Sequence, residues 1–213
     1  MAEPIHIALV DDDSAVLDSL RLYFTRRDVM ATCFRTAEAL FAALDSGAQP
    51  DCIVSDVRMP GMSGLDLVRR LKHYRSPIPI ILMTGVGDID MAVSAMKDGA
   101  FDFIEKPFDE GRLLSSIRNA VAFGRQQASE ATEIEELRSR FATLSARQRQ
   151  VMELAVAGLS NKEIGLQLDI SPKTVENHRA WVMERIGAKS FAELVRIAMK
   201  IEQRPRRPDA AKP

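Results

Sequence analysis

Over its first 125 residues the chain alternates short strand-forming segments with helix-forming ones, and this alternation constrains the fold more than any other feature. Each apolar, β-branched run is followed by a stretch whose apolar side chains recur at helical spacing. Strands that alternate with helices pair in parallel through right-handed crossovers. We therefore predict an α/β fold with a doubly wound, five-stranded parallel sheet. The predicted strands are residues 5–10, 30–34, 52–55, 78–83 and 101–104.

Polar side chains stand where four of these predicted strands end. Asp11 and Asp12 follow the first strand, Asp56 the third, Thr84 the fourth and Lys106 the fifth. In a doubly wound sheet the ligand site lies at the carboxyl ends of the strands. Crowded carboxylates repel unless a cation lies between them, and Mg²⁺ takes one or two carboxylates with phosphate oxygens and water. An aspartate beside such an ion can accept a phosphoryl group while a lysine neutralises its oxygens. The pattern predicts a magnesium-dependent phosphoryl site.

Each of these motifs also has an ordinary structural interpretation. An aspartate run before a helix is typical of an N-cap, a role that Asp13 or Ser14 could fill. A Lys-Pro pair is typical of a turn. The joint occurrence of the motifs at four predicted strand ends favours the phosphoryl site over these separate explanations.

The segments VDDD, SDVRMPGMSG, MTG and EKPF occur in an order and spacing that resembles the receiver domain of two-component response regulators. The resemblance covers residues 1–125 and implies a CheY-like receiver. It also implies a cis peptide bond before Pro107. The roles that it carries over are a metal-binding pair at Asp11 and Asp12, the phosphoacceptor at Asp56, a metal-binding main-chain carbonyl at Arg58, the switch hydroxyl at Thr84, the switch aromatic at Phe103 and the family's lysine at Lys106.

Charge is distributed unevenly along the chain, although the net charge is only -1. Residues 1–125 carry 14 basic and 18 acidic side chains, and residues 126–140 carry 2 and 4. Residues 141–213 carry 13 basic and 8 acidic side chains. Anion binding, and nucleic-acid binding in particular, is therefore expected in the C-terminal third.

Compartment and membrane contact follow from what the sequence lacks. No apolar run approaches the ~20 residues of a membrane-spanning helix, and no secretion signal stands at the N-terminus. Cys33 and Cys52 fit neither a disulfide framework nor a zinc site. We expect a cytoplasmic protein without a membrane partner.

Residues 126–140 contain no proline or glycine and are predicted to form a helical linker. Ile134, Leu137, Phe141 and Leu144 are spaced by three, four and three residues, which permits a short coiled-coil seam. A solvated helix or a pliable tether explains the same segment equally well.

From residue 144 onward the sequence predicts four short helices, at 146–157, 161–168, 172–186 and 191–201. Helix starts are indicated by a serine followed three residues later by Gln or Glu, and by a proline at the first position of the third helix. The second and third helices are joined by a short turn, which is typical of a helix-turn-helix. The serines that give this signal are Ser145, Ser160 and Ser190, and the proline is Pro172.

The segment from Leu144 to Leu194 resembles the LuxR-type DNA-binding domain, and its pairing with a receiver resembles the NarL/FixJ group, closest to the FixJ subgroup. This resemblance implies a helix-turn-helix domain at residues 141–202, followed by a tail at 203–213 whose composition predicts disorder. Base-facing positions are Glu176, Asn177 and Ala180, and positions facing the phosphate backbone are Lys173, Thr174 and Arg179.

The two resemblances together imply a transcription regulator of a two-component system. A sensor histidine kinase would phosphorylate Asp56, and the phosphorylated homodimer would bind double-stranded promoter DNA. RNA polymerase is a further candidate partner. The protein would act as a phosphoacceptor rather than an enzyme, with a chemistry limited to autophosphorylation and autodephosphorylation.

Two alternatives stay open. An aspartyl-phosphate phosphatase would share Asp, Mg²⁺ and Lys, but it needs a second aspartate at the position of Arg58. A phosphotransfer module whose C-terminal helices bind protein or RNA would lack the steep salt dependence of duplex DNA binding.

Overall fold

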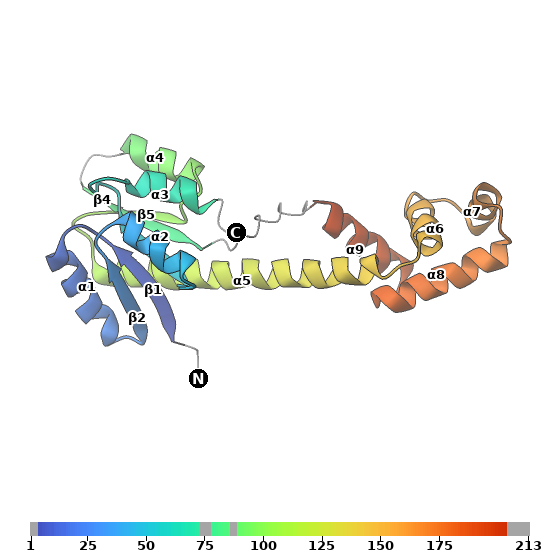
Figure 1. Ribbon diagram of the computed structural model, residues 1–213, viewed down its shortest axis with the longest axis horizontal. Helices are drawn as coiled ribbons and strands as arrows, with labels where there is room; N and C mark the ends of the chain where they lie inside the picture. Colours follow the sequence, from blue (N-terminus) through green and yellow to red (C-terminus); the bar gives the residue numbers. More distant parts are fainter. Residues whose placement is uncertain (1–3, 73–77, 86–88, 204–213) are drawn as a thin grey trace. The chain divides into compact units, whose positions relative to one another are not determined.

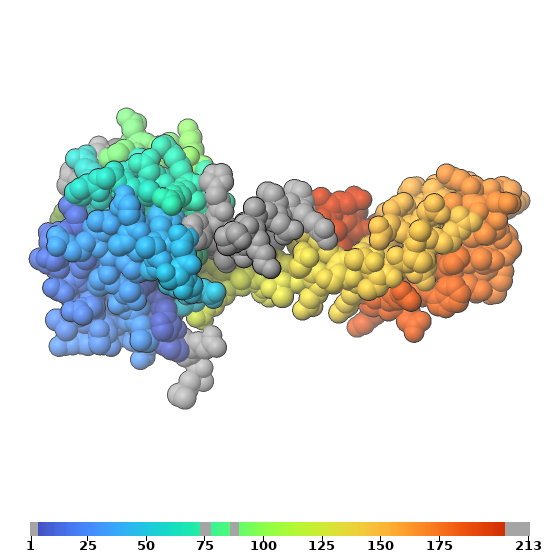
Figure 2. Space-filling model, in the orientation of Figure 1, coloured from blue at the N-terminus to red at the C-terminus, as the bar shows by residue number. Residues whose placement is uncertain are grey.

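The computed structural model describes residues 4–72, 78–85 and 89–203 of the chain. The chain divides into two compact units, Met1–Ala128 and Ser129–Pro213, the first an α/β unit and the second helical (Figures 1 and 2). In these described ranges no helix is both long and apolar enough to cross a bilayer. The predicted disordered tail falls, from residue 204 onward, outside the described residues.

The first unit is built on a five-stranded parallel sheet with the strand order β2-β1-β3-β4-β5. This confirms the predicted fold class, and each strand begins and ends within two residues of its predicted limits. The chain changes direction across the sheet between β1 and β3, which are neighbours. The strands are β1 (Ile5–Val10), β2 (Val29–Phe34), β3 (Cys52–Asp56), β4 (Ile80–Thr84) and β5 (Asp102–Glu105).

Both faces of the sheet are covered by helices, so the strands are apolar on both sides. Along β1, Ile7 and Leu9 join the core beneath one helical layer, while Ala8 and Val10 join the core beneath the other. This alternation is the period of two that a strand imposes on its side chains. The first layer contains α1 (Ser14–Thr25) and the start of α5 (Glu110–Ala142), and the second contains α2 (Ala37–Asp45), α3 (Gly64–Leu71) and α4 (Ile89–Lys97) (Figure 1).

The second unit consists of the end of α5 with four shorter helices. Ser145 and Ser160 form the predicted capping boxes with residues three positions later. The third predicted box is incomplete, because the carboxylate of Glu193 accepts the N–H of Lys189. The helices are α6 (Ala146–Val156), α7 (Asn161–Leu168), α8 (Pro172–Ile186) and α9 (Phe191–Gln203), each starting at its predicted residue.

Helix α5 runs without interruption through the segment predicted as a linker. Ile134 and Leu137 on this helix are buried. On either side of them, Glu133 forms an ion pair of 2.8 Å with Lys200, and Arg138 donates to the carbonyl of Ile201 at 3.5 Å. Both partners belong to α9, so this helix lies against the part of α5 that carries Ile134 and Leu137. The spacing that permitted a coiled coil or a solvated tether instead reflects packing inside the second unit.

Gly64, at the start of α3, provides a test of the packing behind the sheet edge. A Cβ at this position would lie 2.5 Å from the carbonyl oxygen of Asp56 and 2.9 Å from Cα of Val57. Because main-chain atoms cannot move aside cheaply, we expect Gly64→Ala to lower the free energy of unfolding by about 1–3 kcal/mol. Gly85→Ala is the matched control, since no atom lies within 4 Å of its Cβ. Scanning calorimetry measures both, and equal transition temperatures would contradict the prediction.

Candidate functional site

The polar residues predicted at the strand ends lie at one edge of the sheet. Asp11 directly follows β1, and Asp56 ends β3, which pairs with β1 on one side and with β4 on the other. Thr84 ends β4, and Lys106 follows β5, the next strand along. Because parallel strands present their carboxyl ends at the same edge, the sheet order itself brings these four residues into one region.

Lys106 lies between the two buried carboxylates of this edge. Its Nζ donates to Oδ2 of Asp11 at 2.8 Å and to Oδ1 of Asp56 at 2.6 Å. The side chain of Asp11 is 2% exposed and that of Asp56 is 12% exposed, against 28% for Lys106. Burial by itself would lower the pKa of Lys106, but the hydrogen bonds and charges of Asp11 and Asp56 outweigh it and raise the pKa. The ammonium is therefore charged at neutral pH.

Main-chain amides hold the remaining oxygens of the two carboxylates. Oδ2 of Asp56 accepts the N–H of Arg58 at 2.7 Å, and Oδ1 of Asp11 accepts the N–H of Asp13 at 3.0 Å. The carboxylate of Asp13 in turn accepts the N–H of Ala15, which confirms Asp13 as the N-cap of α1. Sequence reasoning missed the amide of Arg58 as a partner of Asp56, because a main-chain contact leaves no signature in side-chain identity.

The oxygen ligands at this edge fit Mg²⁺ chemically. Asp11 and Asp56 supply two carboxylates, and Mg²⁺ takes one or two carboxylates in proteins while it retains water. Asp12 is exposed, and its carbonyl accepts a hydrogen bond from Arg35. Within residues 4–72, 78–85 and 89–203, no group of three or more His, Cys, Asp or Glu side chains is placed to hold a metal. The fit therefore rests on the kind of ligand and on the two buried carboxylates.

The two predicted switch residues lie on adjacent strands. Thr84 is buried, and its carbonyl accepts the N–H of Lys106 at 2.6 Å. Phe103 is half-buried and packs against the core beneath α2 and α3. The peptide bond between Lys106 and Pro107 is cis, as the family resemblance implied.

A hydrogen-bonded link between β5 and α5 adjoins Phe103 and was not predicted. The carboxylate of Asp102 accepts the N–H of Phe103 at 2.8 Å and the hydroxyl of Ser116 at 2.6 Å. Ser116 is buried on α5. Only the tertiary fold brings these residues together, so no local pattern could have indicated the link.

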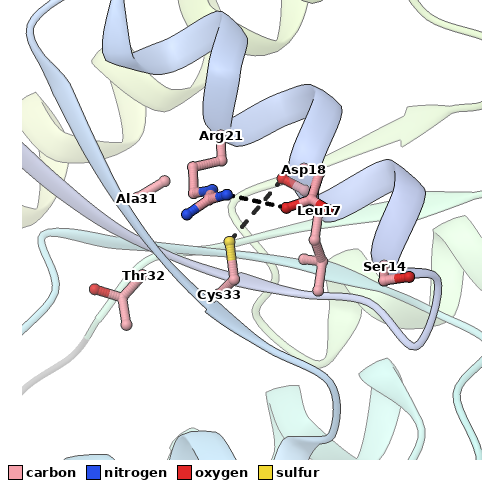
Figure 3. Close-up of a pocket in the computed structure, with 7 residues that line it drawn as sticks. All are labelled: Ser14, Leu17, Asp18, Arg21, Ala31, Thr32 and Cys33. Carbon is pink, nitrogen blue, oxygen red and sulfur yellow. Dashed lines mark hydrogen bonds and ion pairs between the residues drawn. The ribbon is translucent and has the colours of Figure 1, made fainter.

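A separate hollow of about 430 Å³ lies on α1 and β2 (Figure 3). Asp18 and Arg21 form an ion pair of 3.1 Å in its wall, and Sγ of Cys33 lies 4.0 Å from the carbonyl of Leu17. Burial raises the pKa of the Cys33 thiol above its ordinary value, and the nearby Arg21 only partly offsets this effect. The thiol is thus harder to ionise than a free one. The hollow contains none of the predicted site residues.

In the second unit, the predicted DNA-contacting residues lie on α8. Lys173, Glu176, Asn177 and Ala180 are exposed, whereas Thr174 and Arg179 are half-buried. Nζ of Lys173 pairs with the carboxylate of Glu176 at 2.9 Å. The segment that forms α8 is drawn in orange in Figure 2.

Arg179 is tied to two other helices of the second unit. Its Nη1 donates to the amide oxygen of Asn161 on α7 at 2.8 Å, and its guanidinium lies 4.4 Å from the ring centre of Phe191 on α9. Sequence reasoning assigned this arginine to the outer surface. The structure shows that it also joins the helix-turn-helix to the last helix.

Comparison with known proteins identifies both units. Residues 7–118 match the family model described as response regulator receiver domain, and residues 142–198 match the bacterial regulatory proteins of the luxR family. The chain belongs to the luxR-type response regulators. Membership in this family of regulators, which are not classical enzymes, argues against the phosphatase alternative.

Several relatives resemble this response regulator over nearly its whole length. The transcriptional regulatory protein FixJ of Bradyrhizobium diazoefficiens is 47% identical over 92% of this chain and 95% of its own. The structure of the response regulator StyR matches with a TM-score of 0.76 and 35% identity, covering 93% of this chain and all of that chain. Full-length FixJ from B. japonicum matches with a TM-score of 0.59 and 44% identity, covering 96% of this chain and all of that chain.

The shared ammonium of Lys106 predicts a specific loss of stability in this response regulator. Lys106→Met leaves two buried carboxylates without their cation, which costs ~3–5 kcal/mol when all partners are fully buried. Because Lys106 is 28% exposed, we expect the free energy of unfolding of Lys106→Met to fall by about 2 kcal/mol in a buffer that contains a metal chelator. Calorimetry of the full chain measures it. Arg21→Met, which breaks an exposed pair, is the control; a loss in Lys106→Met no larger than the control's would contradict the prediction.

Proposed function

We propose that a sensor histidine kinase phosphorylates this response regulator on Asp56, and that the phosphorylated homodimer binds promoter DNA to regulate transcription. One observation carries the proposal. The ammonium of Lys106 lies 2.6 Å from a carboxylate of Asp56 that is still 12% exposed, at the strand-end edge of a receiver. The relatives named transcriptional regulatory protein FixJ support the transcriptional part.

The residues at the strand ends would have distinct parts in phosphoryl transfer. A carboxylate oxygen of Asp56 would attack phosphorus as the bond to the kinase histidine breaks. Lys106 would then stabilise the phosphoryl oxygens while keeping its contact with Asp11. Asp11, Asp12, Asp56 and the main-chain carbonyl of Arg58 would hold Mg²⁺, which supplies positive charge against the phosphoryl oxygens when bound.

Phosphorylation would act through the two switch residues. The added negative charge draws the hydroxyl of Thr84 toward the phosphoryl group, and Phe103 moves into the space that this vacates. The surface formed by α4 and β5 changes shape as a result and favours a homodimer. A dimer places two copies of α8 on adjacent half-sites of the DNA. Once one copy is bound, the second binds at a high effective concentration, so modest dimerisation produces a large change in DNA occupancy.

On DNA, α8 would enter the major groove. Glu176, Asn177 and Ala180 would face base edges, because asparagine can pair with adenine and small apolar side chains can approach the thymine methyl. The backbone contacts would come from Lys173, Thr174 and Arg179. Arg179 uses one N–H in its hydrogen bond to Asn161. A guanidinium has five N–H donors, so others remain for a DNA phosphate.

We also propose the limits of the functional parts. Residues 1–125 would form the receiver, 126–140 the helical linker and 141–202 the DNA-binding domain, followed by the tail at 203–213. The packing of the α5 residues Ile134 and Leu137 beneath α9 supports a linker that is structurally joined to the DNA-binding domain. The protein would act in the cytoplasm, where RNA polymerase is a further candidate partner.

Asp56→Asn tests the phosphoacceptor. The amide cannot accept a phosphoryl group in place of the carboxylate, so we expect no labelling by acetyl phosphate or by a phosphorylated kinase. The phosphorylation-dependent rise in dimer fraction, measured by sedimentation, should disappear with it. Asp13→Asn is the matched control, because Asp13 caps α1 and should still allow full labelling. Stoichiometric labelling of Asp56→Asn would overturn the site assignment.

Arg179→Ala tests the backbone contacts. We expect weaker binding to every duplex sequence by a similar factor, and a salt slope that is shallower by about 1. Arg118→Ala on α5 in the first unit serves as the control and should leave the slope unchanged. A change in sequence preference alone would contradict the assigned role. If the affinity of the unmodified chain for duplex DNA did not change with salt concentration, the alternative in which the second unit binds protein would be favoured.

A further inference from the structure

Trp181 is the only tryptophan of the chain, and neither the core nor the proposed contacts account for its position. It lies on α8 with 51% of its surface exposed. The ring of His178 packs against it edge to face, with ring centres 5.5 Å apart. The indole is thus held in place on one side and open to a ligand on the other.

The position of Trp181 on the helix places it beside the proposed base-facing residues. Asn177 is four residues earlier, and residues four apart are neighbours on a helix surface. The buried positions of the same helix, Val175, Val182 and Ile186, lie on the other side. Trp181 therefore continues the exposed stripe of Asn177 by one further turn.

The surroundings of Trp181 favour DNA over an apolar protein surface. A hollow of about 510 Å³ adjoins it between α6 and α8, lined by Gln148, Glu184 and Arg185 as well as the indole. This lining is mainly polar, so Trp181 is an isolated ring and not part of an apolar docking patch. The charged neighbours of the ring are one acid, Glu184, and one base, Arg185, so they carry no net charge. A flat ring bordered by polar side chains suits the apolar C–H surface of a nucleotide, which is itself bordered by polar groups.

We infer that Trp181 is a DNA contact that lengthens the footprint of α8 by packing its indole against the apolar surface of a nucleotide. That surface is either the C5 methyl of thymine in the major groove or the deoxyribose beside it. The inference rests on the proposed DNA-binding function. The partial exposure of the ring leaves enough area for the contact to contribute about tenfold in affinity.

The single tryptophan allows a direct test with the full-length chain. Emission from the phosphorylated protein reports on Trp181 alone, and the probe is a 30-base-pair duplex from promoter fragments that the protein captures. We expect DNA to shift the emission and to protect it from acrylamide quenching. Trp181→Ala should bind the duplex about tenfold more weakly. Trp181→Phe should lose less affinity than Trp181→Ala, because its ring keeps part of the apolar contact. Met199→Ala, at an apolar α9 residue that is also 50% exposed, is the control and should bind normally.

Replacing each thymine of the duplex with deoxyuridine distinguishes the two apolar surfaces. A loss of affinity that is absent in Trp181→Ala assigns the contact to a thymine methyl, and protection from quenching without such a loss assigns it to deoxyribose. The inference would be overturned if the unmodified chain bound the duplex without a change in emission and Trp181→Ala bound it equally tightly. That outcome would leave the proposed function standing. Failure of the unmodified chain to bind any duplex would overturn the proposed function with it.

Discussion

The ammonium of Lys106, shared by the carboxylates of Asp11 and Asp56, is the interaction on which the first unit's chemistry depends. The three residues come from distant parts of the sequence and meet because β1 and β3 are adjacent while the residue after β5 reaches across β4. Two buried carboxylates at one edge are unfavourable without a cation. The lysine makes the arrangement stable while the carboxylate of Asp56 remains 12% exposed, so the stability of this edge and the proposed phosphoryl transfer depend on the same side chain.

Helix α5 contributes to the cores of both units. Leu113 and Ile117 near its start belong to the core beneath α1, whereas Ile134 and Leu137 near its end are buried in the second unit, beside the residues that contact α9. Its start also carries Ser116, whose hydroxyl donates to Asp102, the residue before Phe103. A single continuous helix therefore contacts β5 near its start and α9 near its end.

Most of the fold and of the strand-end site was predictable because their signals are local. Strand and helix limits follow from periodicity and capping residues, and the approach of Asp11, Asp56 and Lys106 follows from their places at strand ends. The packing of α5 against α9 was left open because the spacing of Ile134 and Leu137 fits several partners equally. The tie of Arg179 to other helices depends on tertiary neighbours that no sequence pattern identifies.

The ion pair between Glu133 and Lys200 bears on how such regulators can be recombined. Exchanging effector halves between relatives usually means choosing a splice position in the connecting segment. In this chain, a junction after Ala142 would separate α9 from the end of α5 that contacts it. Ile134 and Leu137 would then be exposed on the fragment that carries α5. A junction near Ala128 keeps the second half of α5 together with α9. Chimeras joined there retain all residues of the second unit.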